Sequence, residues 1–94
     1  MMQPMYLFTF NSNLSMDDVR ETLLLSAVAA ESYYGNSKVK MDFSYSVSNE
    51  KPTCLIDAES EVGQHVARVF TGFLANQYGE DSFRVERVER GLLS

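Results

Sequence analysis

Positive charge, cysteine and histidine are all scarce in this chain of 94 residues. Lys and Arg together number 8 against 13 Asp and Glu, so the formal net charge is −5. That sign is wrong for a general binder of nucleic acid or of anionic membranes. The single cysteine, Cys54, excludes an intramolecular disulfide, and the single histidine, His65, excludes a Cys/His metal cage.

The sequence also predicts no targeting or membrane segment. Its first residues show no basic region followed by an apolar stretch, and no apolar run approaches the roughly 20 residues that cross a bilayer. We therefore expect a cytoplasmic protein without membrane association. Hydrophobic residues make up 45% of the chain and charged residues 22%, which is typical of globular proteins. This length predicts one domain over residues 1–94.

Helix and strand patterns alternate along the chain. Ser15 is placed to cap a helix whose apolar residues recur at steps of three and four, and Ser60 is placed to cap a second one. Strands are predicted where apolar residues alternate with polar ones or where aromatic residues cluster. The expected elements are strand 5–11, helix 16–34, strand 38–47, strand 53–58, a helix from the Ser60 cap to Tyr78-Gly79, and strand 83–89.

This βαββαβ order predicts a ferredoxin-like fold. Such a fold is an α+β two-layer sandwich, in which a four-stranded antiparallel sheet has two helices on one face. The strands that precede helices, 5–11 and 53–58, are expected at the centre of the sheet. The opposite face of the sheet is then open.

The open face is expected to be partly apolar. Pairing Tyr45 with Ile56 directs Cys54 and Ile56 to the core and Leu55 to the open face. The first strand is apolar on both sides, so either its even-numbered or its odd-numbered residues fill the core. The candidate open-face interface consists of Tyr6, Phe8, Phe10 and Leu55. Because a monomer rarely exposes such a patch, we expect a homodimer.

Six carboxylates are expected to gather at one edge of the sheet, where both helices are expected to begin. They are Asp17, Asp18, Glu21, Asp57, Glu59 and Glu61. This cluster could dock a basic partner or bind a divalent cation weakly, although its spacing matches no calcium loop. The plainer interpretation is that acidic residues complement the positive ends of the helix dipoles.

Motifs for catalysis or RNA binding are weak. Cys54 and His65 are the one pair that could form a thiolate and its base, but Cys54 is expected in the core and His65 on the polar side of a helix. Residues 7–11 resemble the aromatic first strand of RNA-recognition modules. Residues 53–57 lack the basic residue, the glycine and the stacking aromatics of that module, which argues against direct nucleic-acid binding.

These observations favour a small acidic, non-catalytic protein-binding module. It would act as an adaptor or inhibitor that occupies a basic surface of a partner, of the kind that binds nucleic acid, without a cofactor or metal. The alternative is a cofactor-independent enzyme or small-ligand binder. In that case two copies form a dimeric α/β barrel with a pocket between their open faces, and Tyr6, Tyr45 or His65 supply its polar groups.

Overall fold

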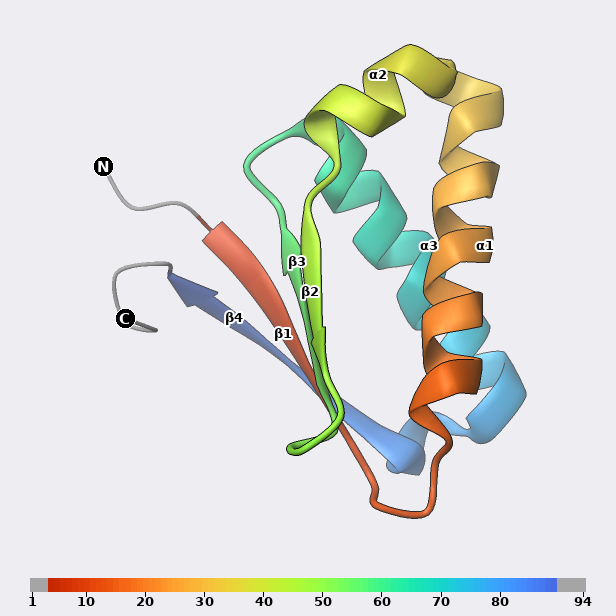
Figure 1. The fold of residues 1–94 in the computed structure, drawn as a ribbon, viewed down its shortest axis with the longest axis vertical. Coiled ribbons are helices and arrows are strands. Elements are labelled where there is room, and N and C mark those ends of the chain that lie inside the picture. The colour runs from red at the N-terminus through yellow and green to blue at the C-terminus, as the bar shows by residue number, and fades with distance from the viewer. Residues whose placement is uncertain (1–3, 90–94) are drawn as a thin grey trace.

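The two central strands of the sheet run in opposite directions, and each leads into a long helix (Figure 1). The structure, a computed structural model, describes residues 4–89. Its elements are β1 (Pro4–Phe10), α1 (Met16–Tyr34), α2 (Asn36–Asp42), β2 (Tyr45–Ser48), β3 (Thr53–Asp57), α3 (Glu61–Tyr78), the short 3₁₀ turn η1 (Glu80–Ser82) and β4 (Phe83–Glu89). The predicted α+β class and four-stranded antiparallel sheet are confirmed.

The strand order is β2-β3-β1-β4, with β3 and β1 at the centre as expected. Tyr45 lies opposite Ile56 in the β2–β3 hairpin, as predicted, and both Cys54 and Ile56 are fully buried. Helices α1 and α3 cover the same face of the sheet and pack against each other (Figure 1).

Both long helices begin and end where their capping residues predict. Ser15 Oγ accepts a hydrogen bond from the backbone N–H of Asp18 at the start of α1, and Ser60 Oγ accepts one from Gly63 at the start of α3. Each helix is followed by a glycine at φ 91°, Gly35 or Gly79. This left-handed backbone is open to glycine because glycine has no Cβ.

The predicted strand over 38–47 is wrong in its first part, because residues 36–42 form α2. Val39 and Met41 would point the same way in a strand, whereas here Val39 is buried and Met41 is 84% exposed. Val39 and Phe43 are four residues apart and both pack toward the core, and Lys38 and Asp42 form an ion pair at 3.4 Å across one helical turn. Over this short segment, the spacing of the apolar residues therefore fits a helix as well as a strand.

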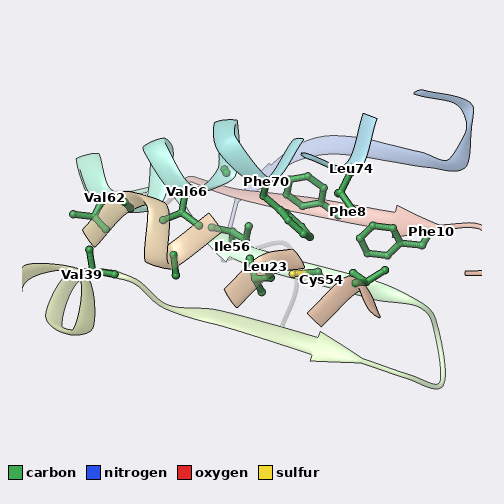
Figure 2. Close-up of a cluster of buried hydrophobic side chains, with 14 residues drawn as sticks. Phe8, Phe10, Leu23, Val39, Cys54, Ile56, Val62, Val66, Phe70 and Leu74 are labelled. Carbon is green, nitrogen blue, oxygen red and sulfur yellow. The ribbon is translucent and has the colours of Figure 1, made fainter. Parts of the chain in front are cut away.

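The core lies between the sheet and the helices and is centred on aromatic rings. Phe8 and Phe10 of β1 point toward the helices, and the Phe8 ring lies 4.9 Å from that of Phe70 on α3 (Figure 2). Aliphatic side chains from the surrounding elements complete this layer, among them Leu23, Ile56 and Leu74. The even-numbered side of β1 thus fills the core, which leaves its odd-numbered side on the open face.

Two glycines of α3 provide a matched test of how closely this helix approaches the sheet. A Cβ at Gly63 would collide with the backbone carbonyl oxygen of Asp57, whereas a Cβ at Gly72 would meet open space. We expect Gly63→Ala to lower the free energy of unfolding by about 1–3 kcal/mol through overpacking. Gly72→Ala should raise it by roughly 0.5–1 kcal/mol, since alanine is the better helix former. Urea denaturation of both variants checks the pair, and equal effects would contradict the close approach.

Candidate functional site

The six carboxylates predicted to share one edge lie in two separate groups. In the antiparallel β1–β3 pair, Met5 is opposite Asp57 and Thr9 is opposite Thr53. The C-terminal ends of the two strands therefore lie at opposite ends of the sheet. Helices α1 and α3 consequently begin at opposite ends of the molecule (Figure 1). The 19 residues of α1 span about 28 Å. The expectation of a single acidic edge is therefore wrong.

The group at the start of α1 consists of Asp17, Asp18 and Glu21, and all three are exposed. Asp17 and Asp18 lie in the first turn, where carboxylates interact favourably with the unpaired N–H groups and the positive end of the helix dipole. This local role accounts for both aspartates. Glu21 lies about one turn further along α1, where it lines a hollow with apolar side chains.

The group at the start of α3 consists of Asp57, Glu59 and Glu61. Asp57 Oδ1 accepts a hydrogen bond of 2.8 Å from the backbone N–H of Glu59, which shapes the turn into the helix. Ser60, between Glu59 and Glu61 in the sequence, caps α3, and its hydroxyl donates a hydrogen bond of 2.8 Å to the carbonyl oxygen of Asp42. Within residues 4–89, no three His, Cys, Asp or Glu side chains come together in a way that could hold a metal ion.

The open face of the sheet differs from the expected one. Phe8 and Phe10 are buried in the core, and Tyr6, which lies opposite the buried Ile56, packs against the same core. Their assignment to the open face is wrong because both sides of β1 are apolar and the sequence did not distinguish them. Leu55 does lie on the open face, half-buried and opposite Leu7.

An exposed apolar patch lies instead on the helical layer. We call it the helix patch, and it consists of Leu24, Leu25 and Val28 of α1 with Phe73 of α3. The exposed fractions of these four side chains run from 40% for Phe73 to 61% for Leu25. Leu25 lines two adjoining hollows, one with Glu21, Leu24 and Val28, and the other with Phe73 and neighbouring residues of both helices.

The sequence contains a signal for the helix patch. Every residue of the run 23–30 except Ser26 is apolar, which is more than a single buried stripe requires at helical spacing. Of the apolar residues in this run, Leu23, Ala27 and Ala30 are the buried ones. The other apolar residues of the run are exposed to solvent.

The candidate catalytic groups, Cys54 and His65, lie in different surroundings. Cys54 is fully buried in β3, and this burial raises the pKa of its thiol to about 12. His65 lies on α3 beside two aromatic rings of α1: its ring centroid lies 5.7 Å from that of Tyr33, in a stacked arrangement, and 5.4 Å from that of Tyr34, edge-on. A thiol that stays protonated in the core is inert as a nucleophile.

The polar groups proposed for a pocket between two open faces are also not on that face. Tyr6 and Tyr45 both lie opposite Ile56, on the side of the helices, and the ring of Tyr45 stacks on Phe43 at 5.2 Å. His65 lines a polar hollow on the helical layer. The residues lining that hollow are Tyr33, Tyr34, Glu61, Gln64, His65 and Arg68.

Cys54 supplies a test of its structural role. Cys54→Ala should lower the free energy of unfolding by about 1 kcal/mol, because it leaves a small cavity. The wild type should lose this advantage over the variant as the pH rises above 9. The unfolded thiol releases its proton near its ordinary pKa of 9.0, whereas the folded one holds it up to about 12. Chemical denaturation at several pH values measures the difference, and a gap that stays constant up to pH 11 would contradict it.

None of the helices within residues 4–89 is long and apolar enough to cross a membrane. Comparison of the chain with models of known protein families, with curated proteins and with solved structures finds no match.

Proposed function

We propose that this chain is a non-catalytic protein-binding domain, an adaptor or inhibitor, that docks a basic partner on its helical layer. The strand order β2-β3-β1-β4, with every pair antiparallel and α1 and α3 on one face, supports a ferredoxin-like scaffold to which α2 is an addition. Because this scaffold serves many functions, the proposal rests on the surface and not on the fold.

The observation behind the proposal is the helix patch. Leu25 and Val28 are each more than half exposed, at 61% and 58%, although they lie in the middle of a long helix. Single exposed apolar side chains are common, but a contiguous group that lines hollows on two helices is typical of an interaction site. Leu25 adjoins Phe73 across the α1–α3 contact, so an inserted side chain would contact both helices.

The charge around the helix patch favours a basic partner. Glu21 lines the same hollow as Leu24, Leu25 and Val28, and Asp17 lies one turn before it on α1. The chain as a whole carries a net charge of −5. A partner that presents apolar side chains flanked by Lys or Arg would complement both features, and opposite charge would speed its association.

A helical peptide of leucine, lysine and alanine, with leucine at spacings of three and four, tests the apolar contact. We expect Leu25→Ser to weaken its binding about tenfold, since burial of a leucine side chain is worth about 1.5–3 kcal/mol. Met41→Ser is the matched control, because Met41 is more exposed but lies on α2, outside the helix patch. Fluorescence anisotropy of the labelled peptide gives both constants. Equal losses in the two variants would contradict the site.

Glu21 tests the choice of a basic partner. Glu21→Gln should slow association of the same lysine peptide, and added salt should reduce the difference from wild type, because exposed charges are screened over about 10 Å at 0.1 M salt. Glu59→Gln, at the opposite end of the molecule, removes the same charge and should have a smaller effect. Stopped-flow measurements give the rates. A peptide with glutamate in place of lysine should bind more weakly, and equal binding of the two peptides would refute the basic partner.

A further inference from the structure

The strand β4 lies at one edge of the sheet and is seven residues long. Its inner side pairs with β1 along its whole length, from Phe83 opposite Phe10 to Glu89 opposite Pro4. Within residues 4–89, no strand pairs with its outer side. A long edge strand of this kind offers backbone N–H and C=O groups to another strand.

An apolar side chain remains exposed at the middle of this edge. Val85 lies opposite the buried Phe8 and therefore faces the helical layer, yet it is 37% exposed. It lines a groove between β4 and α3, together with Tyr6, Ala67 and Thr71 among others. Helix α3 thus leaves the outer part of this edge uncovered.

The sequence of β4 complements itself when two copies are set antiparallel. A two-fold axis perpendicular to the sheet reverses the strand direction and keeps every side chain on its own face. Side chains that pair across the strands must lie on the same face, so the axis must lie midway between one residue of β4 and the same residue of the second copy. With the axis at Val85, Val85 meets Val85 of the second copy. Arg84 then lies opposite Glu86 of the second copy, and Glu86 lies opposite its Arg84. On the helical side, Phe83 lies opposite Arg87 of the second copy, which suits a cation–π contact.

The ion pair already present on β4 fits this arrangement. Arg84 and Glu86 of one chain lie on the same face of the strand, with Arg84 Nε 3.4 Å from Glu86 Oε1, and both side chains are exposed. Pairing about Val85 sets two such ion pairs side by side with their charges alternating. Each charge then has an opposite charge both along its own strand and across the axis.

Other registers are less favourable. An axis at Arg84, Glu86 or Arg87 would place two identical charges directly opposite each other, which is destabilising. An axis at Val88 would set Arg87 opposite Glu89, but it lies one residue from the end of β4 at Glu89 and pairs only three residues of each described strand. The axis at Val85 pairs five residues of each β4 strand, 83–87, with both central charge pairs complementary.

We propose that β4 pairs with β4 of a second copy of this chain about a two-fold axis at Val85. The two four-stranded sheets then form one continuous antiparallel sheet, and the exposed valines cover each other. Because the axis is perpendicular to the sheet, both helical layers lie on the same face. This interface lies along the edge strand β4 and not across the broad open face of the sheet, and it shares no residue with the helix patch.

Two charge reversals test the pairing in a way that controls for folding. Arg84→Glu places a glutamate opposite Glu86 across the axis, and Glu86→Arg places an arginine opposite Arg84, so each variant alone is expected to raise the Kd of the dimer at least tenfold. Mixed in equal amounts, the two variants should form a heterodimer, because both charge pairs across the axis are then complementary. Circular dichroism confirms that each variant is folded, and sedimentation equilibrium measures association against the chain mass of 10.6 kDa.

Leu55→Ser is the control for the open face and should leave the dimer intact. The proposal is overturned if the wild type remains a monomer at millimolar concentration, or if the mixture of reversed variants associates no better than either alone. Loss of the dimer in Leu55→Ser, with retention in Arg84→Glu, would assign the interface to the open face instead. An unchanged dimer in both reversed variants would rule out the axis at Val85.

Discussion

Antiparallel pairing of the two central strands, β1 and β3, determines most of what this domain presents to its surroundings. Each of these strands leads into a long helix, so opposite strand directions require opposite helix directions. The helices then share one face of the sheet and contact each other along their length, while their N-termini lie at opposite ends. The acidic side chains that stabilise those N-termini are separated for the same reason. The acidic residues at the two helix starts therefore do not form one continuous surface.

The helical layer combines tight packing inside with apolar exposure outside. The buried hydroxyls of Thr22 and Ser26 on α1 both have hydrogen-bond partners, since Thr22 Oγ1 lies 3.0 Å from the carbonyl oxygen of Asp18 and 3.1 Å from Gln77 Oε1 of α3, and Ser26 Oγ donates to the carbonyl oxygen of Thr22. In the described part of the chain, no buried side-chain nitrogen or oxygen lacks a partner. The contact between α1 and α3 therefore contains no buried side-chain nitrogen or oxygen that needs a hydrogen bond from an external ligand. The apolar side chains Leu24, Leu25 and Val28 are exposed on the outer side of α1.

Local signals predicted the elements well, whereas the surfaces depended on information that is not local. The serine caps and terminal glycines located both long helices, because their effect is confined to one turn. Residues 38–42, predicted as part of a strand, belong to α2, because Val39 and Phe43 fit both an alternating and a helical period. The two sides of β1 could not be ranked, since only packing against Phe70 distinguishes them. The predicted place of the acidic residues is wrong for a different reason: β1 and β3 are antiparallel, so α1 and α3 begin at opposite ends of the sheet.

Cys54 has a further consequence for how the stability of this domain can be observed. It is the only cysteine of the chain, and it lies fully buried in the central strand β3, between β1 and β2. A thiol-modifying reagent can reach its sulfur only when this part of the sheet opens. The rate of modification under native conditions therefore reports how often the centre of the sheet opens, and it does so without an introduced probe. The sequence already contains a reporter of its own conformational fluctuations in the buried centre of the sheet.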